Sequence, residues 1–456
     1  MTSFVRSFMT GGSLTQRVLR SSAFTSGGFV MAQVIRLASN LILTRLLFPE
    51  AFGLMAMVSV FMMGLVMFSD VGVGPAIMQS KRGDEDDFLD TAWTIQIIRG
   101  FALFIVACIL TWPMSLYFGE PDLIYLLPAT ALTLIIYGFY PTRLETQNRH
   151  MRAGRITLID LATQLISLFV AVVLAWIYQS VWALVLGGIV SALGQLVLLN
   201  VYLPGKTNRL RWEKEAASEL IHFGKWIFLS TVCGFAIGQA DKVIIGGYLS
   251  TYSFGIYNIG YFLAAFPLML GGMVTRRVLI PIYRESPPSA SPENFRHLRK
   301  MRFAATAALM LFGMALAFVG VWLVGVLYDP RYQAAGGVVV LMAVMQMPAI
   351  IVLTYDQAAL ASGASRRYFV LAAARALLIV GGMIAGLMLW GLPGAIIGQG
   401  AALVLAYPVV VWLARREGAW DPLHDASYAA LAVVVGGVAI WVNWPSIAAL
   451  TAMISV

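Results

Sequence analysis

Polar residues inside long apolar stretches are the features of this sequence with the clearest chemical meaning. Gln33, Arg36 and Asn40 lie in the middle of an apolar stretch that runs from Phe24 to Gly53. Their spacing of i, i+3 and i+7 predicts one polar stripe along a helix. An arginine at the centre of a bilayer costs about 2.5 to 3.5 kcal/mol on insertion scales. Arg36 is therefore expected to face a protein-lined or water-filled interior instead of lipid.

Three further cations, Arg99, Lys242 and Arg375, also lie inside apolar stretches. Arg99 and Arg375 could instead lie near helix ends and extend toward the membrane surface, and both interpretations stay open. The planar fork of arginine fits phosphate oxygens in a bidentate way. Several cations and few anions in one lumen favour an anionic passenger such as a diphosphate. The candidate contacts for it are Arg36, Gln33, Asn40, Arg99, Lys242 and Arg375.

Three carboxylates, Asp160, Asp241 and Asp356, fall near or inside apolar stretches, and Asp241 and Asp356 are the candidates for ion coupling. In a protein-lined cavity such carboxylates could bind a coupling cation or proton, or they could neutralise a buried arginine. The sequence favours neither alternative. Asp241 and Lys242 are adjacent, and neighbours on a helix point about 100° apart, so they are not obvious partners.

The elements that position these residues must be membrane-spanning helices. The 456-residue chain is 60% hydrophobic and only 12% charged, which is about half of the charged fraction of a soluble domain. The sequence therefore predicts an all-α polytopic membrane protein. Stretches of bilayer length are found near 24–47, 52–78, 91–117, 123–140, 156–178, 181–203, 223–249, 254–283, 303–328, 334–361, 368–390 and 393–413. A thirteenth span is expected between 427 and 456, and a fourteenth is left open.

These stretches divide the chain into two lobes of about six spans each, residues 23–203 and 223–415. Residues 1–22 are expected to form an amphipathic segment at the inner membrane surface, residues 204–222 a cytoplasmic linker, and residues 416–456 one or two further spans. Basic residues gather in alternate loops, which places the N-terminus in the cytoplasm. Arg299 and Arg302 are counted among these loop residues. The net charge of +9 is thus an orientation signal, and no nucleic-acid partner is expected.

Signals for enzyme chemistry are weak. Gly205-Lys206-Thr207 matches the end of a phosphate-binding loop, but Asn200 stands where that motif requires glycine. No zinc-protease or nucleophile-elbow motif is found, and the four histidines are assigned to loops. The two cysteines lie inside apolar stretches. We therefore expect neither an enzyme nor a cofactor or metal site, which leaves a secondary transporter or a channel.

The two lobes also repeat one another. Phe52-Gly53 and Phe254-Gly255 each follow an apolar span and a short turn. Aligning them places Asn40 opposite Lys242 and Arg36 opposite Gly238. Both halves start from the cytoplasm, so the repeat is parallel, with its axis along the membrane normal.

The stretch Leu43–Gly53, LTRLLFPEAFG, resembles the "LARLLSPEDFG" turn of Wzx-type polysaccharide flippases in the multidrug/oligosaccharidyl-lipid/polysaccharide (MOP) superfamily. Gly74–Gln79, Ala92–Gln96 and Val181–Val185 agree with the same family. Further matches are the segments Gln239–Lys242 with Gly246, Gly255–Asn258 and Leu279–Pro281. The sequence departs from the family pattern at Ile259-Gly260, where alanine is usual, and at Lys242, where arginine is common.

The resemblance implies a V-shaped pair of six-helix lobes with a central cationic cavity that alternates access across the bacterial inner membrane. It also implies a passenger, an undecaprenyl-diphosphate-linked oligosaccharide moved from the cytoplasmic to the periplasmic leaflet with a coupled cation gradient. Membrane lipids, and the polymerase and glycosyltransferases of the same pathway, would be the partners. Two alternatives remain: a cation-coupled multidrug or metabolite antiporter, which should favour carboxylates and aromatics in its cavity, and a non-transporting scaffold, which needs no polar lumen.

Overall fold

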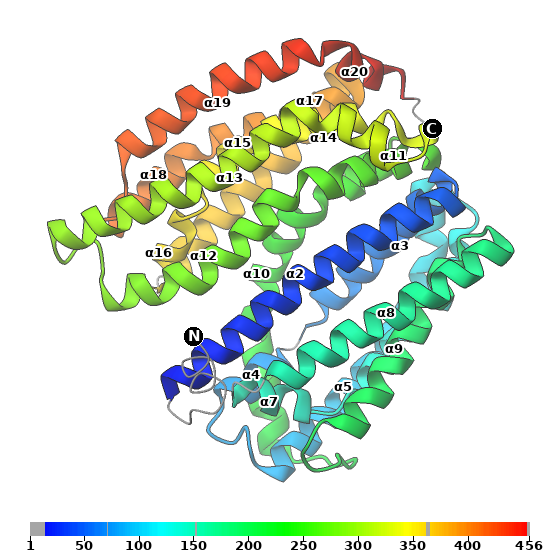
Figure 1. The fold of residues 1–456 in the computed structure, drawn as a ribbon. Helices are drawn as coiled ribbons and strands as arrows, with labels where there is room; N and C mark the ends of the chain where they lie inside the picture. The colour runs from blue at the N-terminus through cyan, green and yellow to red at the C-terminus, as the bar shows by residue number, and fades with distance from the viewer. Residues whose placement is uncertain (1–13, 71, 151–152, 362–364, 454–456) are drawn as a thin grey trace, which may run out of the picture. The chain divides into compact units, whose positions relative to one another are not determined.

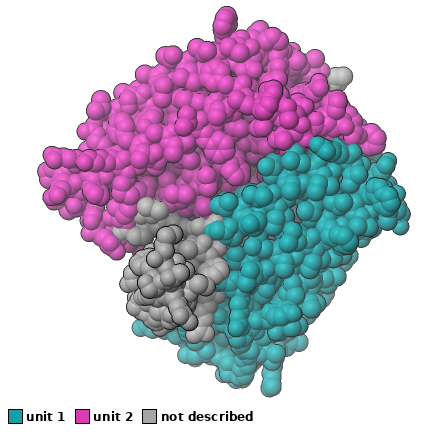
Figure 2. Space-filling model, in the orientation of Figure 1, with its two compact units in different colours: residues 1–47, 58–231 teal, residues 48–57, 232–456 magenta. Residues whose placement is uncertain are grey.

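The computed structural model describes residues 14–70, 72–150, 153–361 and 365–453, and the regular elements of these residues are helices (Figure 1). The chain divides into two compact units (Figure 2). Unit 1 comprises residues 1–47 and 58–231, and unit 2 comprises residues 48–57 and 232–456. Helix α3 therefore begins in unit 2 and ends in unit 1.

The helices up to the linker are α2 (Leu14–Leu46), α3 (Pro49–Phe68), α4 (Val73–Gln79), α5 (Asp86–Phe118), α6 (Leu123–Gly138), α7 (Arg143–Arg149), α8 (Ala153–Tyr178) and α9 (Trp182–Tyr202). Helix α2 runs without a break from the predicted N-terminal segment into the first predicted span, and residues 1–13 of that segment lie outside the described residues. The chain between α9 and the next helix, residues 203–213, is not helical.

The helices after the linker are α10 (Lys214–Gly246), α11 (Thr251–Ala264), α12 (Phe266–Glu285), α13 (Pro292–Leu327), η1 (Pro330–Tyr332), α14 (Ala335–Met345), α15 (Met347–Val352), α16 (Tyr355–Ala361), α17 (Ser365–Leu405), α18 (Tyr407–Arg416), α19 (Pro422–Val442), α20 (Trp444–Ala448) and η2 (Ala449–Ala452). The described C-terminus thus ends in α20 and η2, which are too short to form a fourteenth span.

Nine helices in the described residues are long and apolar enough to cross a membrane, or up to eleven if each of two bent pairs is one span. One apolar segment, Arg366–Arg416, is 51 residues long, about 75 Å at the helical rise of 1.5 Å per residue and therefore too long for one crossing. Helix α17, inside it, is broken at Trp390 and Gly391, where Gly391 has φ 63°.

The two parts of α17 pack against each other through glycine. A β-carbon built on Gly386 would lie 1.9 Å from the carbonyl oxygen of Gly394, and one built on Gly398 would lie 1.9 Å from that of Gly382. Gly386 thus contacts Gly394, and Gly382, one turn further from the break, contacts Gly398, one turn further on the other side. This order of contacts requires the two parts to run in opposite directions. The stretch is therefore a helical hairpin, and its break separates the predicted spans 368–390 and 393–413.

The linker lies along the acidic start of α5. Backbone N–H groups of Arg209 and Arg211 donate to Asp90 Oδ1 and Thr94 Oγ1, both at 3.0 Å. Ion pairs join the linker to α5, through Arg211–Asp87 at 2.7 Å and Lys206–Asp86, and to the turn before α5, through Arg82–Glu213 at 2.9 Å. Glu213 and then Glu85 raise the pKa of Arg82 by hydrogen bonding to its guanidinium. Exposed ion pairs contribute little singly, so the backbone bonds hold this segment in register.

The two predicted repeat turns contact each other. A β-carbon on Gly255 would lie 1.9 Å from the carbonyl oxygen of Pro49, and one on Gly53 would lie 2.1 Å from that of Thr251. Pro49 and Thr251 are themselves equivalent positions when Gly53 is aligned with Gly255. The contact is therefore reciprocal, so the start of α3 and the start of α11 pack about a local pseudo-twofold axis.

Candidate functional site

The polar stripe of the first span lies on α2, at the edge of its packed face. Gln33 is buried, Asn40 is half-buried and Arg36 is exposed on unit 1. Helical spacing places Arg36 about 60° from Gln33, so a boundary between packed and open surface can pass between them. The prediction of one helical face is geometrically consistent with α2. What Arg36 faces in the membrane stays a prediction.

Arg99, on α5, contacts the C-terminal end of α3. Its Nε donates to Ser69 Oγ at 3.1 Å and its Nη2 to the carbonyl oxygen of Val66 at 2.8 Å. A helix end leaves carbonyl groups without partners in the helix, and a cation there is favourable. Arg99 also lines a cavity of about 220 Å³ within unit 1, together with the polar side chains of Gln96, Tyr137, Tyr140, Thr142 and Glu145.

Asp241 and Lys242 lie near the end of α10 and have different partners. Asp241 is 3% exposed and accepts a hydrogen bond from the Tyr257 hydroxyl at 3.0 Å. Lys242 Nζ donates to Gln239 Oε1 at 3.0 Å and lies 5.3 Å from the ring centroid of Tyr261. The carboxylate is thus held toward α11, and the ammonium group is held over an aromatic face.

Arg375 and Asp356 are brought together. Arg375 Nη1 on α17 donates to Asp356 Oδ2 on α16 at 2.6 Å, and the side chains are 13% and 18% exposed. A residue predicted to bind the passenger therefore pairs with a residue predicted to bind a coupling ion. Within the described part of the chain, Arg375 Nη2 and Asp356 Oδ1 are buried without a hydrogen-bond partner.

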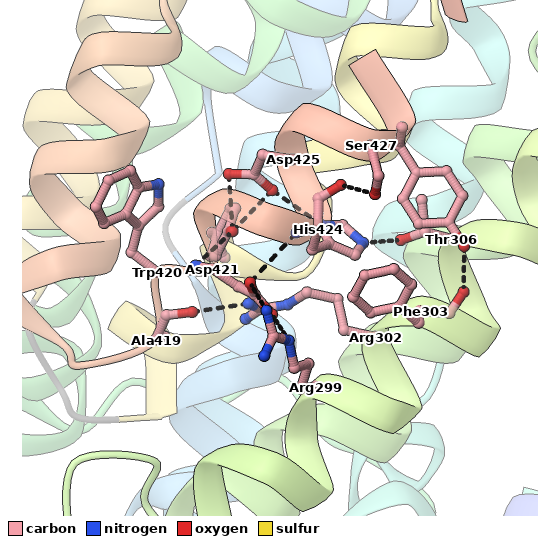
Figure 3. Close-up of polar contacts among 12 residues, drawn as sticks. Arg299, Arg302, Phe303, Thr306, Ala419, Trp420, Asp421, His424, Asp425 and Ser427 are labelled. Carbon is pink, nitrogen blue, oxygen red and sulfur yellow. Dashed lines mark hydrogen bonds and ion pairs between the residues drawn. The ribbon is translucent and has the colours of Figure 1, made fainter. Parts of the chain in front are cut away.

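A polar network around His424 was not predicted from the sequence. The assignment of His424 to a loop is wrong, because this residue lies in the first turn of α19 and is fully buried. Its Nδ1 lies 2.9 Å from Asp425 Oδ1, and its Nε2 lies 3.0 Å from Thr306 Oγ1 on α13 (Figure 3). Asp425 also accepts hydroxyl hydrogen bonds from Tyr355 at 2.8 Å and from Tyr407 at 2.7 Å.

Arg302 joins this network from α13. The sequence analysis counts it among loop cations, but it is 1% exposed inside unit 2. Its guanidinium donates to the carbonyl oxygen of Ala419 at 2.7 Å and to the Tyr283 hydroxyl at 3.0 Å, and its Cζ lies 4.3 Å from the ring centroid of Tyr355. One turn earlier, Arg299 pairs with Asp421 at 2.7 Å (Figure 3). The spacing of Arg299, Arg302 and Thr306 repeats the i, i+3, i+7 stripe and could have indicated this face.

Comparison with known proteins gives the family of the chain. A family model described as "Polysaccharide biosynthesis protein" matches residues 42–336. The lipopolysaccharide biosynthesis protein WzxC of Escherichia coli K12 is 20% identical over 280 residues, 59% of this chain and 55% of that protein. The succinoglycan biosynthesis transport protein ExoT of Rhizobium meliloti is 23% identical over 248 residues, 53% of this chain and 49% of that protein. The chain thus spans about half the length of these curated relatives.

Solved structures show the fold. The lipid II flippase MurJ in an inward closed conformation superposes with a TM-score of 0.67 at 12% identity, covering 95% of this chain and 98% of that one. An inward-facing multidrug resistance MATE transporter gives 0.59 at 15% identity, covering 85% of this chain and 95% of that one. The predicted all-α polytopic fold is confirmed. Because the family model covers more than half of its residues, the chain belongs to the polysaccharide biosynthesis protein family, with the helical fold of a multi-pass membrane protein.

Proposed function

We propose that this protein is a flippase that moves a polyprenyl-diphosphate-linked oligosaccharide from the cytoplasmic to the periplasmic leaflet of a bacterial inner membrane by alternating access, with its N-terminus in the cytoplasm. Relatives whose names refer to lipopolysaccharide and succinoglycan biosynthesis support a saccharide passenger. The diphosphate is the part of such a passenger that a protein can recognise whatever the sugar is.

The Arg375–Asp356 pair carries this proposal. An ion pair in apolar surroundings is costly to break by removing one partner, so Arg375 needs an anion whenever the passenger is absent. Asp356 supplies that anion at 2.6 Å. Arg375 Nη2 and Asp356 Oδ1 are buried and have no hydrogen-bond partner within the described residues, so the proposal requires alternating access to uncover them. A phosphate oxygen can accept from the nitrogen and a sugar hydroxyl can donate to the oxygen, which makes the pair a two-sided contact for a phosphorylated sugar.

The other predicted contacts are proposed to assist. Arg36, with Gln33 and Asn40 on α2, would attract the diphosphate from the first half of the chain only, because its repeat partner is Gly238. Arg99 and Lys242 already donate hydrogen bonds to groups of the protein. Their proposed role is therefore to add positive charge near the passenger. Their attraction is larger in a low effective dielectric than in water.

Cation coupling is proposed to act through Asp356 and Asp241. A proton on Asp356 would remove the charge that holds Arg375 and so change how Arg375 binds a diphosphate. Asp241, bonded to Tyr257, is buried deeply enough that a change in its charge must alter the contact between α10 and α11. Both roles are tested in the vesicle assay described in the next subsection.

Arg375→Ala is expected to abolish transport, and Arg375→Lys to retain only a small part of it, because a lysine cannot give two parallel hydrogen bonds. The decisive variant is Arg375→Ala with Asp356→Ala, which removes both charges together. This double variant should restore the protein level that the single variant loses, yet still fail to export polysaccharide. The measurement is surface polysaccharide in a strain that lacks the native gene, alongside membrane protein level by immunoblot.

Arg366→Ala serves as the matched control, since Arg366 lies on the same helix but is exposed. It should export normally. Export by the double variant at the wild-type level would show that the pair is only structural and would remove the observation on which the proposed function rests.

Arg36→Ala is expected to reduce export at least tenfold without lowering the amount of protein in the membrane. Because Arg36 is exposed on unit 1, an unchanged amount of protein in the membrane would assign a loss of export to the passenger and not to folding. Surface polysaccharide and immunoblot are again the readouts, and Gly238→Arg, which places a cation at the repeat position, tests the asymmetry. Unimpaired export by Arg36→Ala would exclude Arg36 from the site.

A further inference from the structure

The pair formed by His424 and Asp425 has the geometry of a proton-binding site. Its imidazole is fully buried, yet both ring nitrogens have a polar partner: Asp425 at 2.9 Å and Thr306 at 3.0 Å. We propose that this pair binds one proton, and that this proton is exchanged during the transport cycle. The coupling role rests on the proposed function, whereas proton binding does not.

The two partners allow two protonation states with the same heavy-atom positions. In the neutral state, Nδ1–H donates to Asp425 and the hydroxyl of Thr306 donates to Nε2. In the charged state, both ring nitrogens donate, and Thr306 rotates its hydroxyl to accept. A hydroxyl can make this exchange, and a backbone N–H or carbonyl could not. A proton can therefore bind and leave without repacking α13 against α19.

The charges that are hydrogen-bonded or ion-paired within this network balance when His424 is neutral, and Arg415 lies outside it, over the ring of Trp420. Arg302 and Arg299 contribute two positive charges, and Asp421 and Asp425 contribute two negative ones. The extra proton makes the cluster net positive, so its occupancy must respond to any movement of these charges. The titratable and charged groups that face the pair or its direct partners are Arg299 and Arg302 on α13, Tyr355 on α16, Tyr407 and Arg415 on α18, Asp421 and Tyr428 on α19, and Tyr283 on α12.

The site also borders a cavity and is connected to three further helices. Asp425 and Tyr407 are the polar residues that line an otherwise apolar cavity of about 390 Å³ between α15, the end of α17 and α19. The proposal requires that the exchanged proton enters through this cavity, where Asp425 is the carboxylate in the lining. Hydrogen bonds from the pair reach α13, α16 and α18, so one proton changes the interaction among four helices.

A histidine that only fastens α19 to α13 would have the same contacts, and the experiment must separate the two roles. The chain has four histidines, so the ¹⁵N spectrum of histidine-labelled protein in nanodiscs contains few signals, and His424→Gln assigns the one in question. We expect this signal to change from the neutral to the doubly protonated pattern as the pH is lowered over the range in which the protein stays folded. Asp425→Asn should lose the doubly protonated pattern, because it removes the anion that accepts the hydrogen bond from Nδ1. A neutral pattern that persists across this range would overturn the proposal.

Transport provides the second arm. The probe is a fluorescent polyprenyl-diphosphate disaccharide in proteoliposomes, with and without an imposed proton gradient. The wild type should respond to the gradient about tenfold, and His424→Gln should transport at one rate in both conditions. The matched control is His150→Gln, which removes an exposed histidine that also lies 2.9 Å from a carboxylate, Asp84; it should keep the response. Asp356→Asn and Asp241→Asn test the coupling roles proposed above in the same assay.

If His424→Gln does not fold, Thr306→Val and Thr306→Ser provide a second test of the coupling role in the same transport assay. The valine removes the acceptor of the charged state and should abolish the response to the gradient, whereas the serine retains a hydroxyl and should preserve it. A gradient response that survives in Thr306→Val or in His424→Gln would overturn the coupling role. If the wild type does not move the probe at all, the proposed function is overturned. The spectroscopic test of proton binding does not depend on this result.

Discussion

Gly255→Ala is expected to abolish transport and to destabilise the protein by about 3 kcal/mol, at the upper end of the cost of overpacking. The new β-carbon would lie 1.9 Å from the carbonyl oxygen of Pro49 and 2.7 Å from its carbonyl carbon. Both are backbone atoms, so no side-chain rotation relieves the contact, and α3 must move away from α11. The measurement is the thermal unfolding temperature of the purified protein in detergent, together with surface polysaccharide in cells.

The control for this variant is Gly272→Ala, on α12. A β-carbon at Gly272 meets nothing within 4 Å, and alanine is a better helix former than glycine, so its unfolding temperature should stay equal or rise slightly. Gly53→Ala, where the carbonyl oxygen of Thr251 would be 2.1 Å away, should behave like Gly255→Ala. Normal stability of either repeat variant would contradict the reciprocal contact.

Arg302→Met is the second substitution with a large expected effect. It should lower the free energy of unfolding by about 3 kcal/mol, because hydrogen bonds to a charged group are lost. Methionine keeps an unbranched apolar stem but leaves the Ala419 carbonyl oxygen without this donor, and the Tyr283 hydroxyl keeps only its bond to the carbonyl oxygen of Thr354. It also leaves the carboxylates of Asp421 and Asp425 with one balancing cation fewer. Thermal unfolding in detergent measures the effect.

Arg296→Met is the matched control, because Arg296 lies on the same helix and is exposed. Surface substitutions usually change stability by less than about 0.5 kcal/mol. If both variants unfolded at the same temperature, Arg302 would not be the structural centre of the network, and the charge balance around His424 would need revision.

Hydropathy predicted most of the fold because each span must hide its own backbone from lipid. The break at Trp390 and Gly391 was predictable for the same reason, since the apolar run is too long for one crossing. The positions of Arg375 and Asp356 inside apolar stretches were also readable from the sequence. Their pairing was not, because the pattern fits passenger binding, ion coupling and mutual neutralisation equally well.

The His424 network escaped prediction for a different physical reason. Helix α13 starts at Pro292, well before its apolar stretch, so a count of loop cations includes Arg302 although the helix buries it. Pro422 similarly marks what looks like a loop but opens α19 as the first residue of the helix. Charge counts describe where a residue lies along the chain, and burial depends on which helices pack around it.

The reciprocal contact of Gly53 and Gly255 has a meaning for the origin of the chain. In an ancestor of half the length, the same contact would have joined two identical copies as an isologous dimer interface, with each glycine packed on the other copy's turn. Gene fusion would then have converted an assembly into a single chain without creating a new contact. Two separate glycines would now maintain what one codon maintained before, and each half would have become free to acquire residues of its own, such as Arg36, whose repeat position is Gly238.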